Sequence, residues 1–349
     1  MPKRPESSLP AKPSIASTHR CPMIGLTRLA ILALGTLLIV AWTPPAARAA
    51  DIYPSKPISL ILPFGAGNGS DLSSRRLATQ LGKILGQQIV VENRPGAGGV
   101  GAVKQVTSAP ADGYTLMLAG AGMPISQALF NPPPYDMLKS FVPVSAISSN
   151  DVAFLVKASS RYATLDDFIR EAKERKKGLM VGVSLLGTTQ HMAAELFKLH
   201  THTDFTIVPF RTASMLTTAL VGENIDLAFE FVAPTLPMLN SGQLRALAVS
   251  SAQRSPVLPQ VPTVAEQGIP DYAVSSWGMI VAPVNTPAPI VKRLNTEIQN
   301  VLQDPEFIRQ LQGSGTRVLG GTTDQARQLM ESEIVRWKKV IDTAGIALQ

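Results

Sequence analysis

The stretch LILPFGAGNGSDLSSRR carries the residue types in this 349-residue chain that most directly suggest binding chemistry. Its glycines, Gly65, Gly67 and Gly69, follow a strand-like apolar run and precede a helix that we expect to begin at Asp71. Glycine lets a ligand approach the backbone amides closely, and the first N–H groups of a helix lack intrahelical acceptors and carry partial positive charge. The turn is therefore a candidate anion site that needs no arginine. The alternative is an ordinary tight turn in which Ser70 or Asp71 caps the helix.

A second turn in the chain repeats this order of residues. The stretch MVGVSLLGTTQHMAAELF again runs from a strand, through small and hydroxyl residues, into a helix. The two stretches lie in different halves of the chain. Two lobes that each direct a helix N-terminus at a shared cleft would explain the repetition.

Known enzyme motifs are poorly matched by this sequence. The segment from Gly96 to Gly101 fits the dinucleotide pattern G-x-G-x-x-G, but the next strand, YTLMLAGAG, offers no acidic residue for a ribose. The chain has no G-x-S-x-G, no H-E-x-x-H and no Cys/His zinc spacing. His191 falls inside an expected helix, where packing or capping explains it better than general-base catalysis. A secreted enzyme that acts on a carboxylated compound stays the rival interpretation.

Apolar runs that are typical of strands alternate with segments of helical periodicity along most of the chain. The expected strands include ISLILPF, QIVVEN, YTLMLAG, LMVGVS, VAFLV, FTIVPF, IDLAFEF and SWGMIVAP. This alternation predicts an α/β fold of parallel strands with helical crossovers, and the pattern restarts after about Asn150. Thr164 and Asp167 have capping-box spacing, and an apolar stripe predicts a last helix closed by Gly345.

The first 49 residues have the pattern of a leader that is removed on secretion. From Met23, a basic start, an apolar run to about Trp42 and small residues up to Ala49 are typical of a cleaved signal peptide. We expect cleavage near Ala49 and a periplasmic protein. A retained anchor is the alternative, although a membrane span needs about 20 apolar residues. Translation starts at Met1 or at Met23.

Composition disfavours several kinds of partner and reactive group. The leader holds six of the 32 Lys and Arg and one of the 25 Asp and Glu, which leaves 26 against 24, a net charge of +2. No basic patch indicates nucleic-acid binding. Cys21 is the only cysteine and lies in the leader, so the mature chain has no thiol for a disulfide, a metal or a nucleophile. We expect no cofactor, no metal and no catalytic residue.

Several segments, in order, resemble one family of binding proteins. The stretches YPSKPISLILPFGAGNGSD, VVENRPGAGGVGA, APADGYTL and LRALAVSSAQRSPVLPQVPTVAEQG are similar to segments of the Bug-type solute-binding proteins of tripartite tricarboxylate transporters. The resemblance covers the chain from Tyr53 to its end. It implies a type II periplasmic-binding-protein fold, in which two α/β lobes are joined by two crossing segments and a cleft closes on a small carboxylated solute. We expect residues 51–150 and 275–349 to form lobe 1, and residues 151–274 to form lobe 2.

The resemblance also implies which residues bind the solute. Carboxylate recognition in the family relies largely on backbone amides, small hydroxyls and water. Carried over by position, the ligand-binding residues are Phe64, Gly65, Ala66, Gly67, Asn68, Gly69, Ser70, Asp71, Ala121, Gly122, Ser184, Gly187, Thr188, Thr189, His191, Arg211, Ser214 and Glu230.

Three of these positions depart from the family pattern. Asn68 stands in a turn that is usually richer in proline and glycine, Arg211 stands where many members have lysine, and Glu230 stands where aspartate is frequent. A carboxylate at 230 would repel a second ligand carboxylate unless it points away or meets an amine. The alternatives are a surface ion pair for Arg211 and a solvated strand end for Glu230.

The sequence therefore predicts a periplasmic receptor that captures a di- or tricarboxylate, an amino acid or an aromatic acid by hinge closure, for uptake or sensing. The expected partners are the solute and either the membrane subunits of a tripartite tricarboxylate transporter or a sensor protein. No nucleic acid is expected as a partner, and the chain is expected to be a monomer.

Overall fold

Ten strands form one hydrogen-bonded sheet in the computed structural model, which describes residues 53–67, 69–175 and 178–349. Their order is β2-β1-β3-β9-β4-β7-β5-β6, and β8 and β10 pair with β4 outside this order. The strands are β1 (Ile58–Leu62), β2 (Ile89–Asn93), β3 (Thr115–Gly120), β4 (Phe141–Lys157), β5 (Met180–Ser184), β6 (Thr206–Phe210), β7 (Leu227–Phe231), β8 (Leu244–Val249), β9 (Ser275–Pro283) and β10 (Thr316–Val318). The predicted leader lies outside the described residues.

Two sets of parallel strands confirm the expected α/β fold. β1 pairs in parallel with β2 and β3, and β5 pairs in parallel with β6 and β7. β9 instead lies antiparallel between β3 and β4, which the alternation of the sequence did not indicate.

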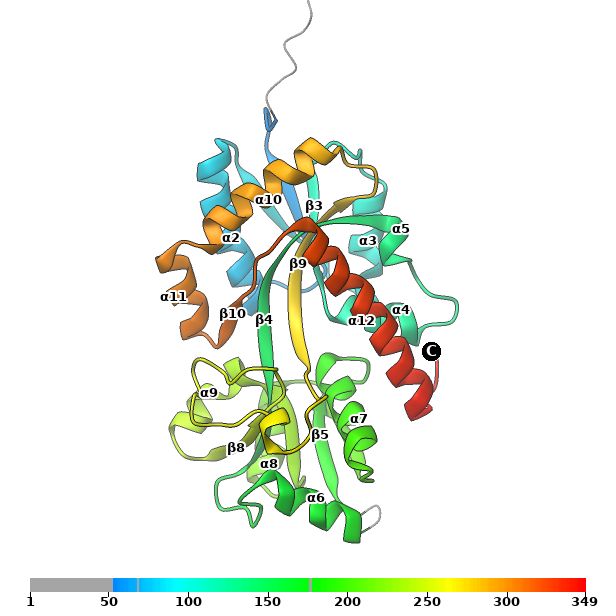
Figure 1. Ribbon diagram of the computed structural model, residues 1–349, viewed down its shortest axis with the longest axis vertical. Coiled ribbons are helices and arrows are strands. Elements are labelled where there is room, and N and C mark those ends of the chain that lie inside the picture. Colours follow the sequence, from blue (N-terminus) through cyan, green and yellow to red (C-terminus); the bar gives the residue numbers. More distant parts are fainter. Residues whose placement is uncertain (1–52, 68, 176–177) are drawn as a thin grey trace, which may run out of the picture. The chain divides into compact units, whose positions relative to one another are not determined.

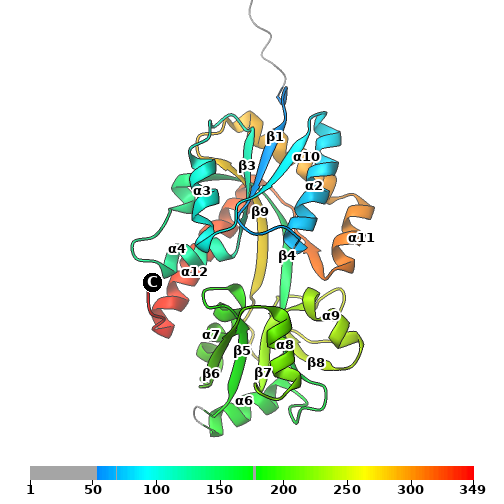
Figure 2. The same ribbon diagram turned by 180° about the vertical axis from the view of Figure 1, so that it is seen from behind.

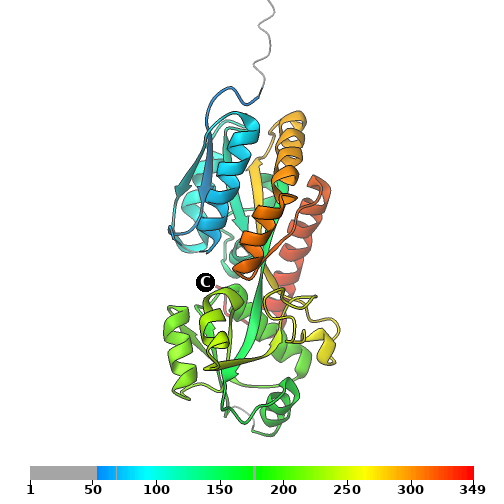
Figure 3. The ribbon, with the colours of Figure 1, turned by 90° about the vertical axis from the view of Figure 1, so that its left-hand side faces the viewer.

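One strand of 17 residues, β4, belongs to both sets. As far as Asp151 it pairs with β9, and from Val152 onward it pairs with β7. We call β1, β2, β3, β9 and β10 with their helices the upper body, and β5, β6, β7 and β8 with their helices the lower body. Figures 1 and 3 show β4 running from the upper body into the lower body. The sequence prediction found only the second half of β4, because the first half contains the polar Ser145, Ser148 and Ser149, which are nevertheless buried. The division of the whole chain into two lobes stays a prediction.

Helices cover both faces of each body. Figures 1 and 2 show α2 and α11 on one side of the upper strands and α3 and α12 on the other, while α7 lies opposite α8 and α9 in the lower body. The helices are α2 (Gly69–Leu85), η1 (Ala97–Gly99), α3 (Val100–Thr107), α4 (Gly122–Leu129), α5 (Met137–Ser140), α6 (Leu165–Glu174), α7 (Thr189–Thr201), α8 (Ala213–Val221), α9 (Val232–Asn240), η2 (Ala265–Gln267), α10 (Ala288–Leu302), α11 (Pro305–Gly313) and α12 (Thr323–Ala344).

Local signals at two helix ends are confirmed. The Thr164 hydroxyl accepts a hydrogen bond from Asp167 N at 3.2 Å, and the Asp167 carboxylate accepts one from Thr164 N at 2.9 Å, which completes the predicted capping box. The last helix, α12, is closed by Gly345, whose φ of 64° is left-handed.

The apolar stripe of α12 packs into two different cores. Ala326 and Met330 lie in a core with residues of α3 and β9. Trp337, Val340 and Ile341 lie in another core with residues of α7, β5 and β7. The last helix therefore holds the upper and lower bodies together.

Candidate functional site

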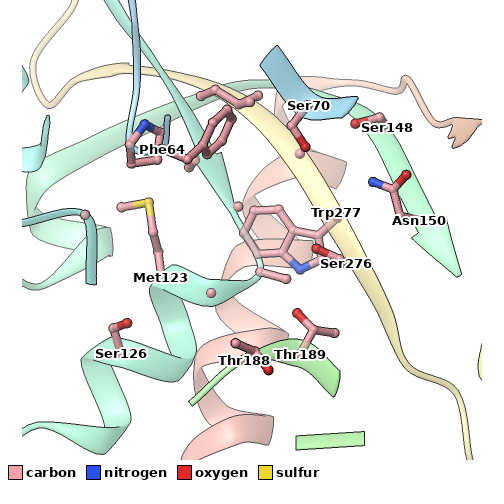
Figure 4. A pocket seen from close by; sticks show the side chains of 18 of the residues that line it. Phe64, Ser70, Met123, Ser126, Ser148, Asn150, Thr188, Thr189, Ser276 and Trp277 are labelled. Atoms are coloured by element: carbon pink, nitrogen blue, oxygen red, sulfur yellow. The ribbon is translucent and has the colours of Figure 1, made fainter. Parts of the chain in front are cut away.

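A cavity of about 470 Å³ lies where the upper and lower bodies meet, and residues of both bodies line it. Figure 4 shows its interior, with Trp277 and Met123 among hydroxyl side chains. The apolar lining consists of Pro63, Phe64, Leu118, Ala119, Ala121, Met123, Ile147, Phe231 and Trp277. The polar lining consists of Ser70, Ser73, Ser74, Ser126, Ser148, Asn150, Thr188, Thr189, Gln190 and Ser276, and six glycines complete the wall.

Five helices begin at this cavity. Its lining includes the N-cap residues of four of them, which are Gly99 of α3, Ala121 of α4, Thr188 of α7 and Phe231 of α9. Ser70, the second residue of α2, also lines it. The first N–H groups of each helix have no intrahelical acceptor and carry a partial positive charge. The helix starts together make the cavity favourable for an anion.

No aspartate, glutamate, lysine, arginine or histidine occurs among the described residues that line the cavity. The lining hydroxyls therefore have no neighbouring base in the lining that could activate them as nucleophiles. An anionic group would be held by neutral N–H and O–H donors, and the apolar lining would contact a hydrocarbon portion of the same molecule. The arrangement is suited to binding.

The glycine turn lies beside the cavity more than in it. Phe64 and Ser70 line the cavity, whereas the predicted residues Gly65, Ala66, Gly67, Gly69 and Asp71 do not, and Asn68 lies outside the described residues. Gly67 has a φ of 87°, and its N–H donates to Asp71 Oδ2 at 2.9 Å. This amide thus binds a carboxylate of the chain itself. Solute binding by the turn stays a prediction.

Asp71 holds the turn against the neighbouring strand. Its buried carboxylate accepts hydrogen bonds from Asn93 Nδ2 at 2.9 Å and from Arg75 Nε at 3.1 Å, as well as from Gly67. Asn93 also donates to Phe64 O at 3.1 Å. Burial alone would raise the pKa of Asp71, but the hydrogen bonds from Arg75, Gly67 and Asn93 lower it to about 2. Asp71 therefore positions Phe64 at the cavity without lining it.

We expect Asp71→Asn to reduce stability at neutral pH and to change how stability depends on acid. Because the pKa is lowered in the folded state, the stabilising contribution of Asp71 is present above the unfolded pKa near 4 and is lost as the pH falls toward about 2. Urea unfolding at several pH values should show the gap between wild type and Asp71→Asn narrowing over this interval. A gap of constant size would contradict the assignment.

The second turn presents three of its predicted residues to the cavity and keeps two behind it. Gly187, Thr188 and Thr189 line the cavity, whereas Ser184 and His191 do not. Gly187 N donates to His191 Nδ1 at 3.2 Å, and Thr188 Oγ1 donates to Ser184 O at 2.7 Å. His191 is thus a capping residue, the alternative that its place in a helix had favoured.

Glu230 lies behind the cavity and is only 2% exposed, so the alternative of a solvated strand end is wrong. Its carboxylate accepts hydrogen bonds from Ser184 Oγ, from Gln190 Nε2 at 2.9 Å and from Phe231 N at 2.7 Å. Gln190 and Phe231 line the cavity. Glu230, which lies on β7, therefore orients Gln190 and Phe231. Its hydrogen bonds to them and to Ser184 direct its charge away from the cavity.

The remaining predicted residues divide between the cavity and the surface. Ala121 and Gly122 line the cavity at the start of α4. Arg211 and Ser214 are exposed, are not part of the lining, and lie on either side of Thr212, which caps α8. Contact of Arg211 and Ser214 with the solute stays a prediction.

Sequence reasoning missed the wall that β4 and β9 contribute, which includes Ser148, Asn150, Ser276 and Trp277. No local signal could have found these four, because they meet only through the antiparallel pairing of two distant strands. A signal did exist for Gly98 and Gly99, which also line the cavity. Their glycine pattern was tested for a dinucleotide and matched to a family segment, but neither glycine was named as a ligand-binding residue. Both have left-handed φ values, 62° and 70°.

Trp277 is fixed in the cavity wall from two directions. Its carbonyl accepts a hydrogen bond from Ala121 N at 3.1 Å, and its Nε1 donates to Glu333 Oε2 at 3.0 Å. Trp337 Nε1 donates to the same oxygen of Glu333 at 2.9 Å. The helix that joins the two bodies thus also holds a wall of the cavity.

Comparison with known proteins identifies the family to which this chain belongs. Residues 73–346 match the family model described as "Tripartite tricarboxylate transporter family receptor". The chain belongs to this family. BugT of Bordetella pertussis is 34% identical to the receptor over 328 residues, which cover 93% of the receptor and 100% of BugT. A UPF0065 protein of Pseudomonas sp. (strain P51) is 32% identical over 326 residues, covering 93% and 97% of the two chains.

Solved structures confirm the fold of the receptor. R. palustris Rpa4515 with adipate is 34% identical, with a TM-score of 0.73 over 85% of the receptor and 100% of that chain. MatC (Rpa3494) from Rhodopseudomonas palustris with bound malate is 29% identical, with a TM-score of 0.69 over 83% and 100%. The periplasmic binding protein BugD is 27% identical, with a TM-score of 0.69 over 85% and 100%. The family and the periplasmic-binding-protein fold predicted from the sequence are confirmed.

Two features are absent from the described part of the receptor. No helix there is both long and apolar enough to span a membrane. No group of three or more His, Cys, Asp or Glu residues there is placed to hold a metal ion.

Proposed function

We propose that this receptor captures a small carboxylated solute from the periplasm in the cavity between its two bodies. The observation that carries the proposal is the convergence of five helix starts on a cavity without an ionisable side chain among its described lining residues. The solved relatives with adipate and with malate support a carboxylate as the anion.

Neutral donors are sufficient for useful affinity. A hydrogen bond to a charged group contributes about 1.5–3 kcal/mol, so three or four such bonds could supply about 8 kcal/mol, the equivalent of a micromolar dissociation constant. Closure of the two bodies about the crossing strands β4 and β9 would bring donors from both onto the solute. Phe64, Met123 and Trp277 would contact its hydrocarbon portion.

The receptor is proposed to hand its solute to a partner without altering it. The family description supports the membrane subunits of a tripartite tricarboxylate transporter as that partner, and a sensor protein is the other candidate. We propose a monomer, secreted with cleavage near Ala49. The lack of a base in the described lining argues against catalysis. Turnover of a carboxylated compound by the purified receptor would instead support the rival interpretation, a secreted enzyme.

Thermal unfolding of the ligand-stripped receptor against a panel of mono-, di- and tricarboxylates, amino acids and aromatic acids tests the proposal. A solute at about 100 times its dissociation constant should stabilise the folded state by about 2.7 kcal/mol, which raises Tm visibly. A shift confined to one acid class would identify the solute class. No shift with any acid would contradict the proposed function.

A further inference from the structure

The hydroxyl of Ser74 is a buried polar group for which the described chain provides no partner. Ser74 lies on α2, one turn after Ser70, and its residue is 0% exposed. Its Oγ has no hydrogen-bond partner among the described residues, although Ser74 lines the cavity. Burying an unsatisfied hydroxyl costs about 1–3 kcal/mol, and here the unsatisfied hydroxyl belongs to a residue that lines the cavity.

Asn150 presents a donor to the same cavity. Its Oδ1 accepts a hydrogen bond from Thr316 Oγ1 of β10 at 2.8 Å. This bond fixes the amide orientation, and the amide nitrogen of Asn150 has no acceptor in the described chain. In Figure 4 this nitrogen points toward the interior and the oxygen points away from it. Since an amide nitrogen can only donate, Asn150 is suited to an acceptor atom of the solute.

Asn150 lies away from the polar residues at the other end of the cavity, and Ser74 follows Ser70 by one turn of α2. Figure 4 shows Ser70, Ser148 and Asn150 at the upper right, and Ser126, Thr188 and Thr189 below. Ser148 and Asn150 are two residues apart on β4 and therefore share one face of the strand. The side chains of Met123, Trp277 and Ser276 lie between the two polar ends. The middle of the cavity is therefore largely apolar, with one serine hydroxyl, and both ends are polar.

We propose that Ser74 and Asn150 form a subsite that binds a second oxygen-bearing group of the solute, through one hydroxyl donor and one amide donor. The inference rests on the proposed function, in which the first carboxylate occupies the end formed by the starts of α3, α4 and α7. Thr316 is a positioning residue, because its hydroxyl holds the Asn150 amide with its nitrogen inward. No carboxylate among the described lining residues could pair with an ammonium group, so the subsite selects a carboxylate or hydroxyl over an amine.

Solutes that differ only at their second end test the subsite. The probes are straight-chain acids of four to eight carbons that end in a carboxylate, a hydroxyl, an ammonium or a methyl group, together with terephthalate and 4-methylbenzoate. Dissociation constants come from isothermal titration calorimetry of the full receptor. For the chain length that fits best, the dicarboxylate should bind about tenfold to a hundredfold more tightly than its methyl counterpart, the effect of one hydrogen bond to a charged oxygen. The ammonium counterpart should bind no more tightly than the methyl one.

Four substitutions assign this preference to named atoms. Asn150→Ala should bring the ratio of dicarboxylate to monocarboxylate affinity close to one while leaving monocarboxylate affinity within about threefold. Thr316→Val, which keeps the shape and removes the hydroxyl, should lower the ratio several-fold, and Thr316→Ser should preserve it. Ser74→Ala should weaken dicarboxylate binding by about tenfold and yet leave the empty receptor equally or more stable, because it removes an unsatisfied buried hydroxyl.

The outcomes separate this inference from the proposed function. If no acid of any kind binds the wild type, both are overturned. If acids bind but Asn150→Ala leaves the ratio of dicarboxylate to monocarboxylate affinity unchanged, for example by weakening both kinds of acid equally, only the subsite is overturned. A lower Tm for empty Ser74→Ala would assign that hydroxyl to the fold and remove it from the subsite.

Discussion

Substitution of Gly122 by aspartate is expected to weaken binding of a carboxylated solute by at least a hundredfold without disturbing the fold. Gly122 is the first residue of α4 and lines the cavity. A Cβ atom at this position meets no heavy atom within 4 Å, so the backbone accommodates a β-carbon without a clash. Two negative charges about 5 Å apart repel by about 3 kcal/mol at an effective dielectric constant near 20, which corresponds to about a hundredfold.

Gly122→Asn is the matched control, because it has nearly the same size and no charge. Aspartate at the first turn of a helix is itself stabilising, so unfolding of the empty Gly122→Asp receptor should occur at or above the wild-type temperature. Calorimetric titration of both variants with the best acid of the panel is the measurement. Equal loss in the two variants would indicate obstruction, and retained affinity in Gly122→Asp would place the anion elsewhere.

Trp337→Ala is expected to lower the free energy of unfolding by about 3–5 kcal/mol, the range found for removal of a large buried aromatic side chain. Trp337 is fully buried in the core that the end of α12 shares with α7 and β5. The substitution also removes one of the two indole donors to Glu333 Oε2. Urea unfolding of the purified variant measures the loss.

Val335→Ala controls for a change elsewhere on the same helix. Val335 is 69% exposed, so its truncation should change stability by no more than about 0.5 kcal/mol. If Trp337→Ala were equally mild, the end of α12 would not hold the lower body. Solute affinity of Trp337→Ala, measured where the variant is folded, should stay within a few-fold of wild type, because Trp277 keeps its own bond to Glu333.

Local chemistry made much of the fold predictable. The capping box of Thr164 and Asp167 and the end of α12 at Gly345 depend only on neighbours in sequence, and both were found. The first half of β4 was not found as a strand, because its buried serines obscure the apolar pattern. The antiparallel course of β9 depends on contacts between residues more than 100 positions apart, which periodicity cannot show.

The candidate site was predictable where a helix begins and unpredictable where strands cross. Thr188 and Gly122 were named by position from the family resemblance, and both lie where a turn leads into a helix. Asp71 and Glu230 were named as ligand-binding residues, but the structure places both behind the lining, where they bind the chain. Sequence shows that a carboxylate is near a turn, but only the tertiary structure shows which way it points.

The separation of charged and neutral residues around the cavity has an evolutionary consequence. The carboxylates of Asp71, Glu230 and Glu333 hold the lining residues from behind, and the described lining itself is serine, threonine, glycine and uncharged larger residues. Substitution of a lining residue that takes no part in these bonds can therefore alter which molecule fits without breaking the bonds that shape the wall. Single substitutions in such a framework can change which solute it binds, and the protein can remain folded after each one.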